Sequence, residues 1–255
     1  KYLRWCAAQR KAPATLRRYI ASFSRLNTLA GAKSLKGNER IKATMRAVYA
    51  ELPRQQGHAK RLGWEEFEPL LQYTGRDLRV LRDRAILCIG YDALLRRSEI
   101  VSIDAEDVSV AQDGSGLLRV RYSKADQQGV GAELFLTKPT IRAVLAWQRA
   151  SGITQGALFR RLVRRRDAPH LVVDRLSAAA IPDILKRSAR WLGIAQEGIS
   201  GHSLRVGAME DLVTAGVSTP GVMNAARLAS DRMVTTYTRG ISATRGAVAA
   251  VANAK

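Results

Sequence analysis

Two arginines in this chain each lie three residues from a side chain that can assist them in binding a phosphate. The first, Arg96, precedes Glu99 in the run LLRRSEI at residues 94–100. Residues three apart on a helix share a face, so the Glu99 carboxylate can orient the guanidinium. Alone, this pair is a weak indication, because Arg–Glu pairs at this spacing are common on protein surfaces.

The second arginine lies in the run SGHSLRVGA at residues 200–208, where His202 precedes Arg205 at the predicted start of a helix. A helix N-terminus favours anions, and an arginine offers a forked pair of donors to phosphate oxygens. A histidine can transfer a proton near neutral pH. The other histidines, His58 and His170, give it no partner at metal-ligand spacing. By itself, this cluster is equally compatible with a structural histidine.

A third feature is Tyr237 in the run TTYTR, on a short predicted helix near the C-terminus. A tyrosine there is usually a packing residue, and the chain has seven. Together, however, the three features resemble the tyrosine recombinase (phage integrase) family in order and spacing. The LLRRSEI run resembles its first arginine box, SGHSLRVGA resembles its His-x-x-Arg box, and Tyr237 follows where the family keeps its nucleophile. The joint match is specific, and the resemblance covers most of the chain.

The resemblance implies a site-specific DNA recombinase that cleaves and rejoins duplex DNA through a covalent 3′-phosphotyrosine and a four-way junction. It implies a mainly α fold with a small antiparallel β-sheet. A helical N-terminal DNA-binding domain and a catalytic domain would then form a C-shaped clamp. No metal, ATP or other cofactor is expected, since the covalent bond conserves the phosphodiester energy. Two alternatives stay open: a type IB topoisomerase-like enzyme, and a DNA-binding relative that has lost catalysis.

The resemblance also assigns roles. Attack on phosphorus builds negative charge on the nonbridging oxygens, and Arg96 and Arg205 would clamp them. The family's lysine lies in the turn of a β-hairpin, and Lys124 matches that place better than Lys138, which follows the second strand. Lys124 would then protonate the leaving 5′-oxygen.

The two remaining residues of the set would support these groups. His202 would donate to the phosphate or manage the proton of Tyr237. Glu99 would hold Arg96 or His202 in place.

One position departs from the family pattern. The family carries a His or Trp nine residues before the tyrosine, and here that position is Leu228. Leucine donates no hydrogen bond to a phosphate. Either the neighbouring Arg227 substitutes, or the site works without this donor, and the usual packing role of leucine favours the second alternative.

Charge points to the same substrate. Lys and Arg number 42 against 22 Asp and Glu, giving a net charge of +20. Residues 1–61 hold 15 of these bases and only two acids, Glu39 and Glu51. Such a surface suits a polyanion, of which DNA is the common one. The predicted DNA-contacting residues are Arg17, Arg18, Arg25, Lys42, Arg46, Arg54, Lys60 and Arg61.

The hydrophobic pattern predicts the elements that must position these groups. Helices are expected at residues 13–31, 38–51, 64–73, 78–91, 139–150, 182–192, 202–215, 220–227, 231–239 and 242–252. Two β-runs, 117–122 and 132–136, predict a hairpin with a long turn, and a single small sheet. The predicted domains are a DNA-binding domain at 1–53, a linker at 54–62 and a catalytic domain at 63–255.

The partners and the compartment follow from the same observations. Cys6 and Cys88 lie far apart and suit a reducing cytoplasm, with the protein on the nucleoid of a prokaryote or encoded by a phage or plasmid. No apolar stretch is long enough to cross a bilayer, and no signal peptide is evident. The first residue, Lys1, opens a segment typical of the middle or end of a helix, which indicates a trimmed N-terminus. The resemblance implies as partners a duplex DNA site with inverted-repeat arms and a homotetramer on two such sites. It also implies that the Ala-rich tail packs into a neighbouring subunit, and the alternative is a C-terminal helix folded back on its own protein.

Overall fold

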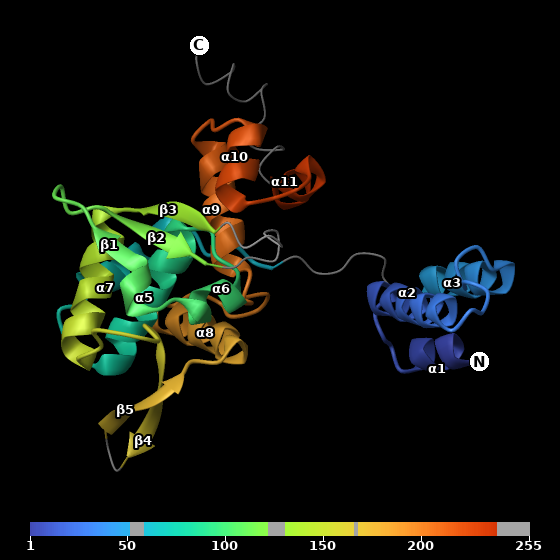
Figure 1. The fold of residues 1–255 in the computed structure, drawn as a ribbon, viewed down its shortest axis with the longest axis horizontal. Helices are drawn as coiled ribbons and strands as arrows, with labels where there is room; N and C mark the ends of the chain where they lie inside the picture. The colour runs from blue at the N-terminus through green and yellow to red at the C-terminus, as the bar shows by residue number, and fades with distance from the viewer. Residues whose placement is uncertain (52–58, 122–130, 166–167, 239–255) are drawn as a thin grey trace. The chain divides into compact units, whose positions relative to one another are not determined.

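The computed structural model describes residues 1–51, 59–121, 131–165 and 168–238 (Figure 1). The chain divides into two compact units, Lys1–His58 and Ala59–Lys255. Of the predicted linker at 54–62, residues 54–58 lie outside the described part, whereas Lys60 and Leu62 belong to the second unit. The Lys60 N–H donates to Gly198 O at 2.9 Å, and Leu62 is fully buried.

The first unit consists of three helices: α1 (Tyr2–Ala8), α2 (Pro13–Leu29) and α3 (Glu39–Glu51). Pro13 lies in the first turn of α2, where its missing N–H has no helical partner to lose. Apolar side chains from all three helices form a small core, in which Cys6, Leu16, Met45 and Val48 are buried. The helices expected at 13–31 and 38–51 are therefore present within one or two residues of the predicted bounds.

The second unit contains the other helices and all the strands of the described chain. The helical segments are α4 (Trp64–Phe67), η1 (Glu68–Gln72), α5 (Leu78–Asp92), α6 (Arg97–Ser102), η2 (Ala105–Asp107), α7 (Lys138–Ser151), η3 (Ala178–Ala180), α8 (Ile181–Trp191), α9 (Ser203–Thr214), α10 (Thr219–Ala226) and α11 (Asp231–Thr238). The strands are β1 (Val108–Val110), β2 (Gly116–Val120), β3 (Ala132–Leu136), β4 (Arg160–Arg165) and β5 (Ala168–Arg175). The mainly α fold with antiparallel sheet is confirmed.

The expectation of a single sheet is wrong. Strands β1, β2 and β3 form one antiparallel sheet, which contains the predicted hairpin, with Leu118 opposite Leu134. Strands β4 and β5 form a second, separate hairpin that projects from the unit (Figure 1). Its sequence was missed because arginines interrupt the alternation of apolar and polar residues that identifies a half-buried strand. Of the hairpin residues whose burial is described, none is fully buried, and Val173 is 81% accessible, so the hairpin needed no continuous buried face.

Helix α5 is the centre of the second unit. It is buried along most of its length and packs against α7, α8 and α9. Gly90 permits the close approach of α9, because a Cβ there would lie 2.9 Å from Leu204 Cδ1. Gly207 does the same on the other side of α9, where a Cβ would lie 2.4 Å from the carbonyl oxygen of Leu62. These two glycines let α9 sit deep in the core, and α9 carries Arg205.

Asp211 on α9 fixes the depth and rotation of that helix. Its carboxylate accepts hydrogen bonds from the Tyr91 hydroxyl at 2.6 Å, from Arg61 Nη2 at 2.6 Å and from the Trp64 N–H at 3.2 Å. Burial, followed by the contact with Asp211, raises the pKa of Tyr91, so its phenol remains a donor. One carboxylate thus joins α9 to α5 and to the start of α4.

Candidate active site

The first predicted pair, Arg96 and Glu99, is formed at the N-terminus of α6. Arg96 is the residue before the helix and has an extended backbone, so the two residues do not share a helix face as the spacing suggested. Instead, Glu99 Oε2 accepts the Arg96 N–H at 2.9 Å, and Glu99 Oε1 accepts Arg96 Nη1 at 2.7 Å. The pairing was predicted correctly, but the geometry is that of a helix cap.

Glu99 is only 4% exposed, yet it stays charged. Burial alone would raise its pKa, but the Arg96 N–H, the charge of Arg227 and the Arg96 side chain together lower it below its ordinary value. A buried carboxylate with both oxygens hydrogen-bonded is a rigid anchor for the arginines that contact it.

The second arginine, Arg205, is also 4% exposed and reaches two carbonyl groups that are far away in sequence. Its Nη1 donates to Leu94 O and its Nη2 to Ala226 O. These carbonyls lie at the C-terminal ends of α5 and α10, where unsatisfied carbonyls and the helix dipole attract a cation. Arg205 therefore holds two helix ends together.

Both helix ends are unusual in the same way. Leu94 (φ +46°) and Arg227 (φ +49°) adopt the left-handed conformation that closes a helix and that glycine usually provides. For other residues this conformation costs roughly 1–2 kcal/mol. The turns are closed by Leu95 N–H to Gly90 O at 3.0 Å and by Leu228 N–H to Met223 O at 2.9 Å. Arg205 thus bonds to carbonyls at or next to two strained residues, which stabilises both turns.

His202 lies directly before α9 and is exposed, and its N–H donates to Ser200 Oγ at 3.3 Å. Partial burial lowers its pKa, and the charges of Arg205, Arg97 and Arg96 lower it further. The neutral imidazole, which both donates and accepts hydrogen bonds, is therefore the dominant form at pH 7.

Arg97 is a residue that the sequence reasoning missed. It is exposed, its Cδ lies 3.2 Å from where a Cβ on Gly201 would be, and its charge acts on the imidazole of His202. The only sequence signal was its place inside the arginine box. It adds positive charge at the side of the site where His202 lies.

The two remaining predicted catalytic residues are Tyr237 and Lys124. Tyr237 lies on α11, which packs against α9 and α10, the helices that carry and contact Arg205. Lys124 lies outside the described residues. The last described residue before its loop, Arg121, is held by Asp107 Oδ1 at 2.8 Å and by Asp104 Oδ2 at 3.0 Å. The roles of Tyr237 and Lys124 therefore stay predictions.

The predicted DNA-contacting residues have diverse surroundings. Arg17, Arg18 and Arg25 are exposed on α2, and Arg17 lies over the ring of Tyr49 at 5.2 Å. Arg61 is bound by acidic groups, with Asp211 at 2.6 Å as its nearest.

Of the remaining residues in this set, Lys42 and Arg46 lie in the first unit and Lys60 lies in the second. Lys42 and Arg46 share Glu39, at 2.8 Å and 3.7 Å, and Lys60 Nζ donates to Ala195 O. Arg54 lies outside the described residues. None of these arrangements tests contact with DNA.

At the position of the departure, Leu228 is a packing residue. Its side chain packs against an apolar cluster that includes Leu94, Met209 and Val234. The neighbouring Arg227 points instead to Ala93 O at 3.1 Å and to Glu99 Oε2 at 2.9 Å. Neither alternative from the sequence included this contact with Glu99.

The described residues contain no cluster of three or more His, Cys, Asp or Glu placed to hold a metal ion. Whether the reaction proceeds without metal stays a prediction. Likewise, no helix within the described ranges has the length and apolar character to cross a membrane.

The part of the chain that carries this site matches a known protein family. The model of the phage integrase family matches residues 60–242, which include Arg96, His202, Arg205 and Tyr237. The chain belongs to the phage integrase family. The resemblance stated from its boxes is thereby confirmed.

Curated relatives and solved structures agree with this membership. The chain is 26% identical to the Cre recombinase of Escherichia phage P1 over 263 residues, which cover 97% of this chain and 76% of that protein. It is 26% identical to an integrase/recombinase XerD homologue of Selenomonas ruminantium, over 88% of this chain and 67% of that protein.

Among solved structures, the Tn1549 transposon integrase in complex with circular intermediate DNA gives a TM-score of 0.60 at 12% identity, over 92% of this chain and 78% of that one. A λ integrase dimer bound to a core site gives 0.56 at 18% identity, over 92% of this chain and 76% of that one. These likenesses show that the fold is that of the family.

Proposed function

We propose that this chain is a site-specific DNA recombinase that cuts and rejoins duplex DNA through a phosphotyrosine at Tyr237. The observation that carries the proposal is the convergence of Arg96, Arg205 and His202 where the ends of α5 and α10 meet α9. Arg96 comes from one part of the chain and His202 with Arg205 from another, and α11, which holds Tyr237, packs on α9 and α10.

The chemistry balances without an external energy source. The Tyr237 oxygen attacks phosphorus, a phosphotyrosine bond forms, and the bond from phosphorus to the 5′-oxygen breaks. Lys124 supplies a proton to the departing 5′-oxygen, and neutral His202 can accept the tyrosine proton or donate to the phosphate. The two guanidinium groups stabilise the charge on the nonbridging oxygens, and each such donor contributes ~2.7–4 kcal/mol to lowering the barrier. A 5′-hydroxyl from the partner DNA reverses the step.

The partner of this reaction is a duplex DNA site, and we propose that the protein acts as a homotetramer on two such sites.

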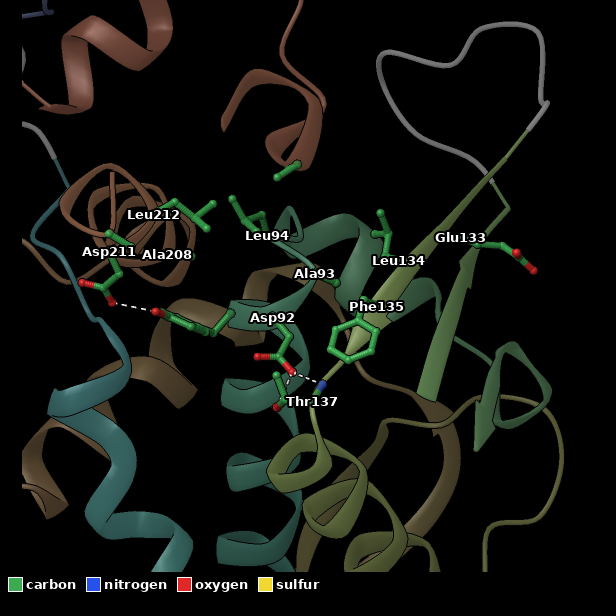
Figure 2. A pocket seen from close by; sticks show the side chains of 13 residues that line it. Asp92, Ala93, Leu94, Glu133, Leu134, Phe135, Thr137, Ala208, Asp211 and Leu212 are labelled. Atoms are coloured by element: carbon green, nitrogen blue, oxygen red, sulfur yellow. Dashed lines mark hydrogen bonds between the residues drawn. The ribbon is translucent and has the colours of Figure 1, made fainter. Parts of the chain in front are cut away.

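A hollow of about 510 Å³ lies between α5, β3, α9 and α10 (Figure 2). Apolar side chains dominate its wall, among them Leu134, Phe135 and Leu212, and Phe135 is 61% exposed. Residues 242–252 are rich in alanine and lie outside the described residues. We propose that this segment of a neighbouring copy occupies the hollow.

The function is tested in two steps. Sequencing the DNA that the purified protein retains gives the target site. A nicked suicide version of that site should then trap a protease-sensitive covalent adduct, also in excess EDTA. Intact sites should yield four-way junctions.

Each alternative has its own outcome in this assay. Binding without any adduct would indicate a DNA-binding relative that has lost catalysis. Adducts and relaxation of supercoils without junctions would indicate a topoisomerase-like enzyme. Loss of adducts in EDTA with recovery on adding Mg²⁺ would overturn the metal-free mechanism.

DNA affinity should depend steeply on salt, because a basic surface releases counterions from the phosphates that it neutralises. We expect the triple variant Arg17→Ala/Arg18→Ala/Arg25→Ala to flatten the plot of log K against log salt by about 0.9 for each lost phosphate contact. These three side chains are exposed on α2. Filter binding from low to moderate salt measures the slope.

A control with the same change in net charge separates local contacts from overall charge. Arg76, Arg142 and Arg149 are exposed in the second unit, and their triple alanine variant removes three charges too. If both variants change the slope equally, α2 does not contact the DNA backbone.

A further inference from the structure

We propose that Arg227 is a positioning residue of the active site, which fixes Glu99 and through it holds Arg96 ready for the scissile phosphate. The inference rests on the proposed function and assigns a role that the sequence alternatives did not contain. In those alternatives, Arg227 either donated to the phosphate or did nothing.

The Glu99 carboxylate is held between two guanidinium groups. Its Oε1 accepts Arg96 Nη1 at 2.7 Å, and its Oε2 accepts Arg227 Nη2 at 2.9 Å. Each carboxylate oxygen is thus bonded to a different guanidinium. With both oxygens fixed, the carboxylate cannot rotate, and the Arg96 side chain that it holds has less freedom to leave its place.

Arg227 also lies where the ends of two helices meet. Its guanidinium also donates to Ala93 O at 3.1 Å, so it joins the end of α5 to the end of α10. Its own carbonyl lies 3.5 Å from Arg96 Nη2, and the preceding carbonyl, of Ala226, accepts from Arg205. One turn of backbone therefore contacts both arginines that would clamp the phosphate.

The backbone of Arg227 has an unusual conformation. Its φ of +49° lies in the left-handed region, where glycine is favoured and a branched or long side chain is strained. A strained conformation persists only where the surroundings determine it, and such residues cluster at functional sites. Here, the surroundings are the turn closed by Leu228 N–H to Met223 O and the bonds of the Arg227 side chain to Glu99 and to the end of α5.

The same contacts commit the charge of Arg227 to the Glu99 carboxylate. Both terminal nitrogens of Arg227 already donate within the protein, and its side chain is only 12% exposed. Its Nε is shielded from solvent and donates to no other described residue. Each terminal nitrogen carries a second N–H, so the ion pair with buried Glu99 is what distinguishes Arg227 from Arg205, whose described acceptors are carbonyl oxygens. The Leu228 side chain, packed in the apolar cluster, adds no donor either.

The test combines Arg227→Gly with Glu99→Gln. Glycine accepts the left-handed backbone, so Arg227→Gly should still fold and bind DNA with near-normal affinity, with a thermal midpoint lowered by the loss of the buried ion pair with Glu99. Single-turnover cleavage of the suicide site should slow about 10- to 100-fold, as expected for a misplaced reacting group. Arg227→Lys, which can still pair with Glu99, should recover a substantial part of that rate.

A double-mutant cycle provides the readout that a merely structural role would not move. If Arg227 acts through Glu99, then Arg227→Gly should slow cleavage far less in the Glu99→Gln background than in the unmodified protein. Additive effects would overturn the inference. So would an unchanged rate in Arg227→Gly, or full rescue of Arg227→Gly by Leu228→His, which would identify a lost phosphate donor.

A variant that fails to fold and a protein that forms no adduct are interpreted separately. If Arg227→Gly does not fold, Arg227→Gln takes its place in the same cycle, because it keeps most of the side-chain length and loses the charge. If the unmodified protein forms no adduct at all, the proposed function fails. Normal adducts together with a silent Arg227→Gly would refute only the role of Arg227.

Discussion

Tyr237→Phe is expected to abolish covalent protein–DNA adducts while DNA affinity remains unchanged. The phenol oxygen is the atom that would form the bond to phosphorus, and phenylalanine keeps the ring while removing that atom. Without the phenol oxygen no phosphotyrosine can form, so the loss should reach the detection limit of the assay. A nicked suicide substrate, with adducts separated on a denaturing gel, measures it.

Tyr73→Phe is the matched control. Tyr73 also lies in the second unit, and its hydroxyl accepts the N–H of Asp77 at 3.2 Å on an exposed turn. Its removal deletes a phenol oxygen that has no place in the proposed chemistry, so adduct formation should persist. Adducts formed by Tyr237→Phe would show that another residue is the nucleophile.

Arg205→Ala is expected to reduce both cleavage and stability. Cleavage should slow about 10²- to 10³-fold, since one preorganised donor to the transition state is lost. The free energy of unfolding should fall by about 1–3 kcal/mol for each buried carbonyl left without a partner. The two carbonyls are those of Leu94 and Ala226. Arg205→Lys should recover little, because one ammonium group cannot reproduce a fork that spans both.

Arg84→Ala separates the two effects. Arg84 is buried like Arg205, and its Nη1 donates to Tyr73 O at 2.8 Å, but its contacts lie at the end of η1. Its loss should lower the free energy of unfolding with little change in the cleavage rate. Denaturant titration and single-turnover cleavage of the three variants give both quantities. If Arg205→Ala cleaves at the rate of Arg84→Ala, Arg205 is structural only.

The spacing of residues along the chain was enough to predict the parts of the site that lie close together in sequence. Arg96 and Glu99 pair across three residues because a helix start brings a carboxylate back to the first N–H groups. Helices such as α2 and α5 were also predictable, since each begins at a local signal and repeats its apolar residues at helical spacing. The hairpin of β2 and β3 followed from two apolar runs around glycines.

What the sequence could not provide was any contact formed when distant segments return to one another. Arg205 bonds to Leu94 O across 111 residues, and Arg227 bonds to Glu99 across 128. No periodicity specifies such pairs, because they depend on how deeply α9 packs against α5 and on two left-handed turns. The hairpin of β4 and β5 was not predicted, because arginines interrupt the alternation of apolar and polar residues and no strand residue with a described burial is fully buried.

The order of the boxes therefore determined the family and the types of catalytic group. Only the tertiary structure decided how those groups are held. A guanidinium that can bind phosphate can also bind buried carbonyls and carboxylates, and burial makes each such partner costly to leave unpaired. That physical requirement is why Glu99, Ala226 and Leu94, which carry no reactive proton in the proposed mechanism, fix the positions of the arginines proposed to bind the phosphate.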